Sequence, residues 1–414
     1  MLPRMRRTPI KRLERLERFL LRLIQVPGAD QGHPWTIRSF LVFLKGISLC
    51  FWAVVQARLL FYETGILRRY PLGCQVISVG NVTVGGTGKT PVVEVFAREL
   101  QKSGRKVAIL SRGYRKKELP WYERIFREHI DPPRIVSDGH HVLLDSEMGG
   151  DEPYMLAVNL PGVVVLVDKN RVKSGRFAVR KFGCDTLVLD DGFQYQKLKH
   201  RLELVLVDRT NPFGNGNLLP RGILREPIRN LKRANFFFIT KSDGQCDDLR
   251  AELARINPDA EIIECRHEPR RLRDAFSATD KPLEWLRDLP VLSFSGIAAP
   301  QSFEGSLRTL GARVVECQRF TDHHRFSQQE LIDAVNRAED IGAKAIITTE
   351  KDAVRMPRLE NPAVPIYYLR VDIEILRGAE NFTQAVEHIC FRNGREKTNA
   401  SGPAASIPVV TPQG

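Results

Sequence analysis

Several features that would assign this chain to a class of protein are scarce or missing from its 414 residues. The seven cysteines are scattered and form no C-x-x-C pair, which argues against a zinc site and a disulfide framework and indicates reduced thiols in a cytosolic protein. No internal repeat is present. Acidic residues number 49 against 63 lysines and arginines, and the net charge of +14 indicates an anionic partner such as nucleic acid, a membrane or a phosphorylated small molecule.

A long uncharged apolar run is also missing. Residues 39–62 are mostly apolar, but Lys45 and Arg58 interrupt them, whereas a membrane-spanning helix needs about 20 apolar residues. We therefore predict a membrane-associated helix within 38–64, embedded in the cytoplasmic face of a membrane, with a core helix as the alternative. The basic arm before it, residues 1–37, favours either an amphipathic helix on an anionic membrane, or a solvated or nucleic-acid-binding arm.

The strongest motif is a glycine-rich loop between a predicted strand and a predicted helix. This is the context of a Walker A loop, in which backbone N–H groups and a helix N-terminus bind the phosphates of a nucleotide. Lys89 would reach the β- and γ-phosphates, and the Thr90 hydroxyl would bind Mg²⁺. Thr83 stands where the strict pattern has glycine. The predicted phosphate-binding residues are Thr83, Val84, Gly85, Gly86, Thr87, Gly88, Lys89 and Thr90.

From Gln75 onward, apolar runs alternate with helical segments, which is typical of a parallel α/β sheet covered on both faces. The runs are 76–79, 107–110, 163–167, 187–189, 204–207, 234–240, 291–295, 345–348 and 366–369. Prolines and glycines break this rhythm between 211 and 233. We therefore predict a P-loop NTPase-like α/β/α domain over 65–225, a second, smaller α/β/α domain over 226–392, and a disordered tail over 393–414.

Two pairs of carboxylates suit phosphoryl transfer. Asp190 and Asp191 end an apolar strand, as a Walker B carboxylate that holds Mg²⁺ does, although paired aspartates are also common in turns. Asp151 and Glu152, followed by proline, suit either a plain helix start or a catalytic base beside a magnesium ligand. The spacing alone does not decide between these two readings.

Histidines precede a predicted helix in the second domain. Ser327 and Glu330 form a capping box, which places His323 on the loop side, facing any cleft between the domains. A metal site there lacks further His or Cys at a suitable spacing. An acid–base pair between His323 and a carboxylate is the sharper hypothesis.

A nucleotide switch is the alternative function. The segment Thr240-Lys241-Ser242-Asp243 ends a strand with a T-K-x-D pattern, which GTPases use to read guanine, but the D-x-x-G switch sequence is missing. The phosphate loop is similar to that of partitioning-type ATPases, but Val84 occupies the position of their signature lysine.

Taken together and in this order, the motifs resemble the tetraacyldisaccharide 4′-kinases, the lipid A 4′-kinases of Gram-negative bacteria. The resemblance covers nearly everything from Gln75 to Val371. Two positions depart from the family pattern: Tyr195 stands where histidine is usual, and Arg115-Lys116-Lys117 where small residues are common. The matching runs are 79–91, 110–114, 150–153, 190–194, 213–216, 219–227, 322–323 and 349–354.

The resemblance implies transfer of the γ-phosphoryl of ATP, with Mg²⁺, to the 4′-hydroxyl of a tetraacylated glucosamine disaccharide 1-phosphate. The product would be the bisphosphorylated lipid A precursor. The reaction would take place between two α/β/α domains at the cytoplasmic face of the inner membrane. The partners implied are this lipid and the anionic membrane surface, and no nucleic acid is expected.

The resemblance also implies residue roles. Asp151 would accept the hydroxyl proton, with His323 orienting it or sharing the proton, and Lys89 would neutralise charge on the transferred phosphoryl. The implied metal ligands are Thr90, Glu152 and Asp190 or Asp191. The candidates for substrate or phosphate contact are Arg112, Arg171, Arg225 and Glu226.

Overall fold

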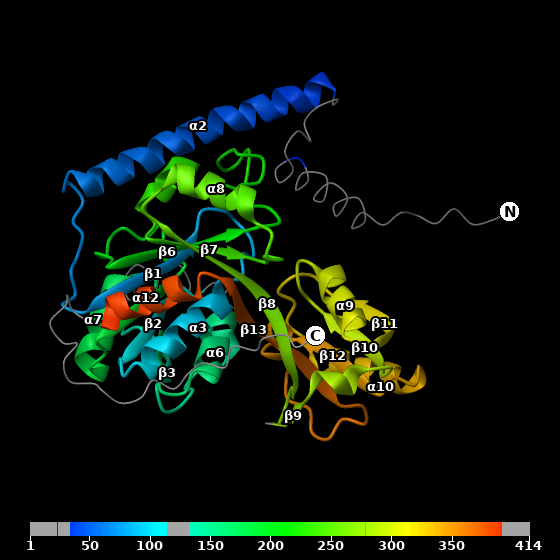
Figure 1. Cartoon of the computed structure of the whole chain (residues 1–414). Helices are drawn as coiled ribbons and strands as arrows, with labels where there is room; N and C mark the ends of the chain where they lie inside the picture. Colours follow the sequence, from blue (N-terminus) through cyan, green and yellow to red (C-terminus); the bar gives the residue numbers. More distant parts are fainter. Residues whose placement is uncertain (1–22, 24–33, 114–131, 278, 391–414) are drawn as a thin grey trace, which may run out of the picture.

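The computed structural model describes residues 23, 34–113, 132–277 and 279–390. Most of the predicted basic arm, the loop Arg115-Lys116-Lys117 and the predicted disordered tail lie outside these residues. One continuous sheet runs through the whole molecule (Figure 1). Its strand order is β11-β10-β12-β13-β8-β7-β6-β1-β5-β2-β4-β3, with β9 paired to β8.

In the part of the chain that the structure describes, the strands are β1 (Gln75–Asn81), β2 (Val107–Ser111), β3 (Arg134–Asp138), β4 (Val164–Val167), β5 (Thr186–Asp190), β6 (Leu202–Asp208), β7 (Phe236–Thr240), β8 (Glu261–Asp274), β9 (Asp280–Lys281), β10 (Pro290–Ser295), β11 (Arg313–Arg319), β12 (Ala345–Thr349) and β13 (Ile366–Arg377). The helices are α2 (Trp35–Glu63), α3 (Lys89–Lys102), α5 (Ser146–Gly149), α6 (Asp151–Asn159), α7 (Arg171–Phe182), α8 (Asp247–Ile256), α9 (Pro300–Thr309), α10 (Gln328–Asp340), α11 (Glu350–Ala353) and α12 (Ala379–Cys390), with 3-10 helices η1 (Ile228–Arg233) and η2 (Leu283–Leu286). All nine predicted strand runs fall within or overlap observed strands.

Helices cover both faces of the sheet, as the sequence predicts. The side chains of Ile77 and Val79 pack in one core with α3, α6 and α12, whereas Val76 faces the opposite core with α7. Successive side chains of a strand point to opposite faces, so a strand covered on both sides must be apolar throughout. The P-loop NTPase-like α/β class is therefore confirmed.

Two long strands connect the lobes. We call β1–β7 with α3, α5–α8 and α12 the P-loop lobe, and β9–β12 with α9–α11 the second lobe. β8 and β13 pair antiparallel and run from one lobe into the other (Figure 1). The first residues of β8 pair with β7, and β7 pairs with β6, so both belong to the sheet of the P-loop lobe.

The chain therefore crosses between lobes later than the boundary that we predicted at 225/226, and the last helix returns to the P-loop lobe. The proline- and glycine-rich segment 211–227 is not the connection between the lobes. It packs beside the phosphate loop, where Thr83 bridges to Leu224 and the amide of Val84 donates to the Ile223 carbonyl at 2.8 Å. Prolines and glycines here shape a wall of the cradle instead of a hinge.

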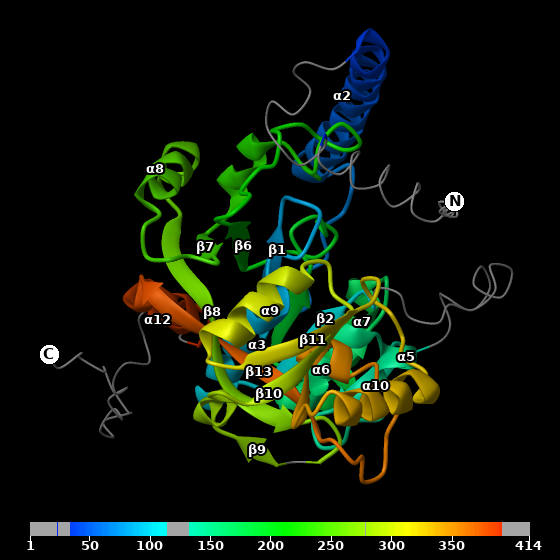
Figure 2. The same ribbon diagram turned by 90° about the vertical axis from the view of Figure 1, so that its right-hand side faces the viewer.

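The N-terminal helix α2 lies outside the core, contrary to the core-helix alternative. Only Leu41, Ser48, Val55 and Leu59 are buried along its 29 residues. Figure 2 shows its N-terminal half projecting beyond the rest of the molecule. Its length and a mean hydropathy of 1.9 in its most apolar window also make it the one helix among the described residues able to cross a membrane by composition.

Candidate active site

The phosphate loop follows β1 and leads into α3, as predicted. Gly88 has φ +75°, and an ideal Cβ on it would lie 2.4 Å from Cε1 of His267, so this position requires glycine. The T-K-S-D segment supports the loop from the end of β7. Thr240 Oγ1 donates to the Thr87 carbonyl at 3.0 Å, and Lys241 Nζ donates to the Gly86 carbonyl at 3.4 Å. This segment therefore has a structural use that does not require guanine.

Lys89 lies between a side-chain amide and a carboxylate. Its Nζ donates to Asn81 Oδ1 at 3.2 Å and lies 3.4 Å from Asp191 Oδ1. Arg225 Nη1 contacts both oxygens of the Asp191 carboxylate, at 2.9 and 2.8 Å. Burial alone would raise the pKa of Asp191, but the charges of Lys89 and Arg225 outweigh burial and hold it below its ordinary value. Asp191 is thus an ionised carboxylate beside the predicted phosphate site.

Asp190 has a different environment. Ser111 donates to its Oδ2 at 3.2 Å, while Arg171 donates to its backbone carbonyl at 3.0 Å and not to its carboxylate. Burial and then the charge of Asp191 raise the pKa of Asp190 to about 6. Glu152 lies near enough to add to this increase. Negative charge therefore accumulates at the end of β5.

This accumulation fits a bound Mg²⁺ ion. Mg²⁺ in nucleotide sites takes one or two carboxylates from the protein and keeps phosphate and water oxygens in its shell. The Thr90 hydroxyl with the carboxylates of Glu152 and Asp190 supplies ligands of this type. Among the described residues, no group of three or more His, Cys, Asp or Glu is arranged to hold a metal by itself. Oxygens of the nucleotide would have to complete the shell.

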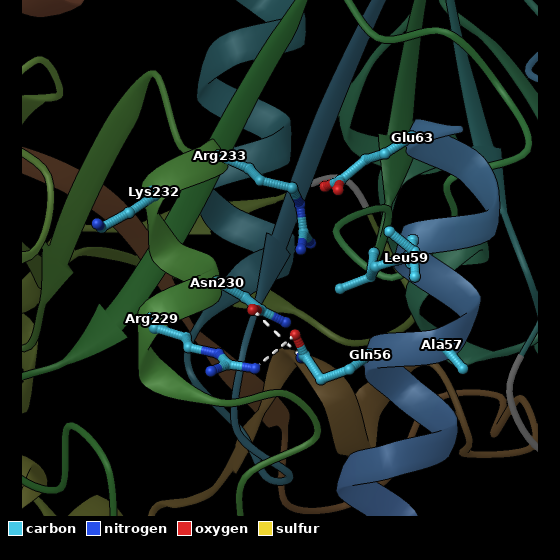
Figure 3. A pocket seen from close by; sticks show the side chains of 9 residues that line it. Gln56, Ala57, Leu59, Glu63, Arg229, Asn230, Lys232 and Arg233 are labelled. Carbon is cyan, nitrogen blue, oxygen red and sulfur yellow. Dashed lines mark hydrogen bonds between the residues drawn. The ribbon is translucent and has the colours of Figure 1, made fainter. Parts of the chain in front are cut away.

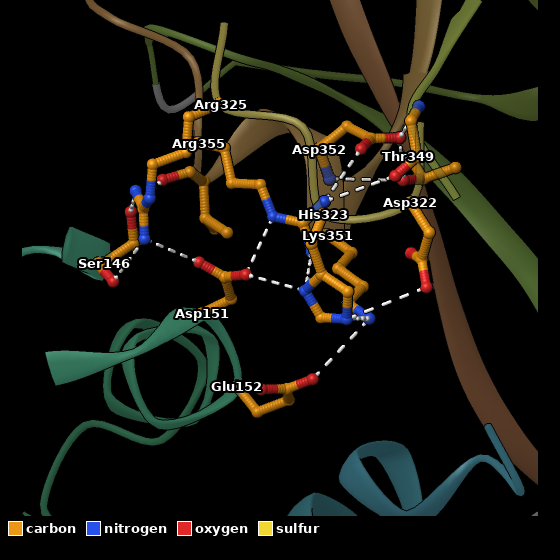
Figure 4. Close-up of polar contacts among 12 residues, drawn as sticks. Ser146, Asp151, Glu152, Asp322, His323, Arg325, Thr349, Lys351, Asp352 and Arg355 are labelled. Atoms are coloured by element: carbon orange, nitrogen blue, oxygen red, sulfur yellow. Dashed lines mark hydrogen bonds and ion pairs between the residues drawn. The ribbon is translucent and has the colours of Figure 1, made fainter. Parts of the chain in front are cut away.

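Asp151 meets the second lobe. Its helix α6 has Gly150 as the N-cap, so Asp151 is the first helical residue and not the cap. Its Oδ2 accepts from Arg355 Nε at 2.8 Å and lies 3.3 Å from His323 Nδ1, and its Oδ1 accepts from Arg325 Nη2 at 3.2 Å (Figure 4).

These contacts determine the charge of Asp151. Burial would raise the pKa of its carboxyl, but the hydrogen bond to His323 and the charges of Arg355 and Arg325 outweigh it and lower the pKa below its ordinary value. The second lobe thus supplies the cations that keep a buried carboxylate of the P-loop lobe ionised.

His323 also contacts Lys351. The Lys351 Nζ lies 3.2 Å from His323 Nε2 and 3.6 Å from Glu152 Oε1. Ammonium and guanidinium groups only donate, so Lys351 donates to Nε2, while Arg355 Nη2 lies 3.1 Å from Nδ1, the ring nitrogen that also faces Asp151. Lys351 therefore links the predicted acid–base pair to the predicted metal ligand Glu152.

The remaining predicted contacts differ in their placement. Arg112 is exposed just after β2. Arg171 is buried and its guanidinium lies 5.0 Å from the centre of the Tyr195 ring, so Tyr195 packs against the arginine that holds the end of β5. Glu226, predicted to contact substrate, is instead fully buried and accepts from Asn230 and Arg233, both at 2.9 Å. Its role is therefore to hold the chain beside Arg225.

Sequence reasoning did not predict that Arg325, Lys351 and Arg355 contact the predicted acid–base pair. Arg325 directly follows the histidines, and Lys351 lies inside the run 349–354. Asp352, in the same short helix α11, accepts from Arg355 Nη1 at 3.2 Å. A periodic or spacing pattern carries no signal for such a cluster, because its partners come from distant parts of the chain. Only the order of the motifs pointed to this region.

A glycine-rich loop between a strand and a helix, carboxylates at a neighbouring strand end and an Asp151–His323 pair across the two lobes are the features of a P-loop phosphotransferase. The family model of tetraacyldisaccharide-1-P 4′-kinases matches residues 40–390. The chain is 42% identical over 341 residues to the tetraacyldisaccharide 4′-kinase of Anaeromyxobacter sp. (strain Fw109-5), covering 81% of this chain and 88% of that protein. It is 37% identical to that of Syntrophus aciditrophicus, with 86% and 93% covered.

A solved structure agrees with these relatives. The crystal structure of LpxK from Aquifex aeolicus in complex with ATP has a TM-score of 0.67 and 27% identity, over 85% of this chain and 100% of that one. The chain therefore belongs to the tetraacyldisaccharide-1-P 4′-kinase family, and the predicted resemblance is confirmed. It is a kinase of lipid A biosynthesis that uses ATP, and the nucleotide-switch alternative is not favoured.

Proposed function

We propose that the chain transfers the γ-phosphoryl of ATP to the 4′-hydroxyl of a tetraacylated glucosamine disaccharide 1-phosphate, at the cytoplasmic face of the inner membrane. The observation that carries this proposal is the pairing of Asp151 with His323 across the two lobes. A phosphotransferase that acts on a hydroxyl needs a carboxylate to accept its proton beside the bound nucleotide. Lys351, between His323 and Glu152, connects the pair to the nucleotide side of the site.

In the proposed reaction, the 4′-oxygen forms a bond to the γ-phosphorus while the bond from that phosphorus to the bridging oxygen of ADP breaks. The hydroxyl proton passes to Asp151. Because its pKa is lowered, Asp151 is ionised at neutral pH and ready to accept. A weak base suffices, because the transition state of phosphoryl transfer is loose and the hydroxyl loses its proton late. His323 would orient the carboxylate, since its Nδ1 lies 3.3 Å from Asp151 Oδ2.

Charge on the phosphoryl group is the second requirement. Lys89 would leave Asp191 for the β- and γ-phosphates, and Arg225 would keep Asp191 in position. Mg²⁺, when bound by Thr90, Glu152 and Asp190 or Asp191, neutralises negative charge on the phosphates. The arginines around Asp151 also favour an anionic substrate near the second lobe.

The membrane location is supported by α2. Its C-terminal half is attached to the rest of the molecule, since Gln56 Nε2 donates to Asn230 Oδ1 at 3.4 Å (Figure 3) and Arg58 Nη2 donates to the Gln194 carbonyl at 3.3 Å. Ser48, at the middle of the helix, donates to the Leu218 carbonyl at 2.9 Å. The opposite face and the N-terminal half are left for lipid. Exposed large apolar side chains on α2 are Trp35, Phe40, Val42, Phe43, Ile47, Leu49, Trp52, Val54, Leu60 and Phe61.

The test is phosphate transfer from γ-labelled ATP to a tetraacyldisaccharide 1-phosphate in mixed micelles. We expect bisphosphorylated product from the wild type and a loss of at least about 100-fold in kcat for Asp151→Asn. Asp333→Asn is the matched control, because Asp333 is exposed on α10 and its carboxylate accepts only from Gln329 on the same helix. A folded wild type that binds ATP and makes no product would overturn the proposal, whereas equal rates in Asp151→Asn would remove Asp151 from the reaction.

A further inference from the structure

One buried arginine joins the helices that carry the two sides of the active site. Arg370 belongs to β13, which runs between the lobes (Figure 1), and only 5% of its surface is exposed. Its Nη1 donates to both carboxylate oxygens of Glu350, at 2.7 and 2.8 Å, and its Nη2 donates to Glu94. Glu350 begins α11 of the second lobe, and Glu94 lies in α3, the helix that follows the phosphate loop. Arg370 therefore bonds to both lobes at once.

A third helix joins the same group through Asn159, the last residue of α6. Its Nδ2 donates to Glu350 Oε1 at 2.7 Å and to Glu94 Oε2 at 3.3 Å. Arg98, one turn further along α3, donates to Glu94 at 2.5 Å and to the Asn159 carbonyl at 3.2 Å. Each oxygen of the two carboxylates thus accepts a hydrogen bond, and a buried network that is fully satisfied is rigid. We call Glu94, Asn159, Glu350 and Arg370 the interlobe clamp.

The clamp lies where β13 passes from one lobe to the other. Leu369 is the last residue of β13 that pairs with β12, and its side chain is buried in a core of the second lobe. Ile373 already packs against the core of the P-loop lobe. Between them, the antiparallel ladder with β8 is irregular at Arg370 and Val371. Irregularities of this kind bend a strand, so the clamp bridges the lobes at the point where their connection can bend.

On the second lobe, the clamp is adjacent to the acid–base pair. Glu350 is followed directly by Lys351, whose ammonium lies 3.2 Å from His323 Nε2 and 3.6 Å from Glu152 Oε1. The same short helix contains Asp352, which accepts from Arg355 Nη1 at 3.2 Å. A shift of α11 would therefore move the groups that contact His323.

On the P-loop lobe, the clamp holds the two helices that begin in the site. Glu94 follows Thr90 by four residues on α3, which is about 6 Å along the helix axis. Asn159 ends the helix that Asp151 begins. The clamp therefore relates the position of α11 to the phosphate loop and to the proposed base.

We propose that Arg370 is a positioning residue for phosphoryl transfer, which fixes Lys351 and His323 relative to the phosphate loop. This inference rests on the proposed function of the site. A guanidinium suits this task, because its planar fork holds one carboxylate with two bonds and still offers a donor to a second one. Lysine would keep the charge, but its ammonium is a point charge on a flexible stem and cannot fix both glutamates in one geometry.

Steady-state kinetics of Arg370→Lys, with γ-labelled ATP and the tetraacyldisaccharide 1-phosphate, test the inference. We expect kcat to fall about 30-fold, since a misplacement of about 1 Å at a reacting group can cost roughly 100-fold. The affinity for ATP should stay within about twofold of the wild type, because the phosphate loop lies within one lobe. A wild-type kcat in Arg370→Lys would overturn the inference.

Glu350→Gln tests the clamp from the second lobe with a smaller change, since the amide keeps one oxygen that can accept from Arg370. We expect kcat to fall about tenfold, again with unchanged affinity for ATP. This variant decides the question if Arg370→Lys does not fold, because a wild-type kcat in Glu350→Gln would contradict the clamp.

Arg319→Lys is the matched control. Arg319 Nε and Nη2 donate to the two oxygens of the buried Glu304, at 2.7 and 2.8 Å, so this arginine makes the same fork, but wholly within the second lobe. Its kcat should equal that of the wild type. An equal loss of kcat in Arg319→Lys and Arg370→Lys would indicate a general effect of weakened folding, and the inference would be wrong.

A double variant shows whether Arg370 acts through His323. If it does, His323→Gln/Arg370→Lys should have the same kcat as His323→Gln alone, because the ring that Arg370 positions is already missing. If the two losses multiply, Arg370 acts on another part of the enzyme, and the inference is wrong.

Nitrogen NMR of the full chain with isotope-labelled histidine distinguishes this inference from the proposed function, since it needs no lipid substrate. The signals of His323 are those that disappear in His323→Gln. We expect Arg370→Lys to shift the Nε2 signal, because this nitrogen accepts from Lys351, and Arg319→Lys to leave it unchanged. An unchanged signal in Arg370→Lys would overturn the inference. A wild type that makes no product would instead contradict the proposed function and leave the NMR result readable.

Discussion

Asp151 and Asp190 are both buried carboxylates, with 5% and 8% of their surface exposed, yet the protein treats them in opposite ways. His323, Arg355 and Arg325 from the second lobe outweigh the burial of Asp151 and lower its pKa, whereas burial and the charge of Asp191 raise the pKa of Asp190 to about 6. Burial alone therefore does not fix the charge of a carboxylate, because neighbouring cations can outweigh it. Asp151 has such cations from the second lobe, while at Asp190 burial prevails over Lys89 and Arg171.

The largest expected effect comes from removing an arginine that contacts Asp151. Arg355→Met removes the cation of the buried Asp352 and one of the two arginines on Asp151, and we expect the free energy of unfolding to fall by about 3 kcal/mol. Chemical denaturation measures it. Arg337→Met is the matched control, since Arg337 pairs with Glu316 on the exposed face of α10 and β11, and it should unfold at the wild-type midpoint. Equal midpoints for both variants would show that Arg355 does not compensate Asp151.

The next effect separates chemistry from nucleotide binding. His323→Gln removes the ring that orients Asp151 but leaves the cradle intact, so we expect kcat to fall about 100-fold with an unchanged affinity for ATP. Lys89→Met changes the cradle and should weaken ATP binding. Steady-state kinetics and equilibrium nucleotide binding give both quantities. A parallel loss of ATP affinity in His323→Gln would mean that the Asp151–His323 cluster and the phosphate loop are not independent.

A smaller effect concerns the pH dependence of Mg²⁺ binding. Below about pH 6 the Asp190 carboxyl is protonated, and a metal ligand must be ionised, so Mg²⁺ affinity is fully present above this pH and is lost as the pH falls through it. We expect a decrease of about tenfold for each pH unit below 6. Titration of the ADP complex with Mg²⁺ at a series of pH values measures this affinity. Asp190→Asn is the control for protons on the nucleotide itself, and the same slope in that variant would contradict the role of Asp190.

The smallest effect concerns the departure from the family pattern. Tyr195 stacks on Arg171, which holds the backbone of Asp190. Tyr195→His keeps a ring at this position, so we expect less than about 1 kcal/mol of change in unfolding free energy and a kcat within about threefold of the wild type. Tyr195→Ala should lose more unfolding free energy and more kcat than Tyr195→His. A large loss in Tyr195→His would show that the phenol itself is required.

The phosphate cradle and the Asp151 cluster also differ in how far the sequence predicts them. The cradle is a local motif, since Lys89 and Thr90 follow a strand and begin a helix, and Asp190 ends a neighbouring apolar strand. The Asp151 cluster joins residues that are 172 positions apart or more, and no periodicity reports such contacts. His323, moreover, adopts φ +65°, which the residue type does not predict.

The fold shows the same division. The predicted strands are short, apolar and buried on both faces, and they were found because such runs have a clear pattern. The strand β8 was missed because its second half, from Arg266 to Asp274, is rich in charged residues and mostly only half-buried where it leaves the P-loop lobe. The predicted boundary at 225/226 follows the prolines and glycines of 211–233, whereas β8 and β13 are the segments that run between the lobes.

The return of the chain from the second lobe has a consequence for biosynthesis. The ring of Phe382 in α12 meets Phe96 of α3 edge-on, with centres 5.8 Å apart, and Ala385 is buried in the same core. A ribosome delivers these residues after the whole second lobe, so the helix that follows the phosphate loop waits for its last packing partner until translation has nearly finished. The nascent P-loop lobe therefore exposes part of its core throughout synthesis of the second lobe, and a prematurely terminated chain yields no complete nucleotide-binding unit.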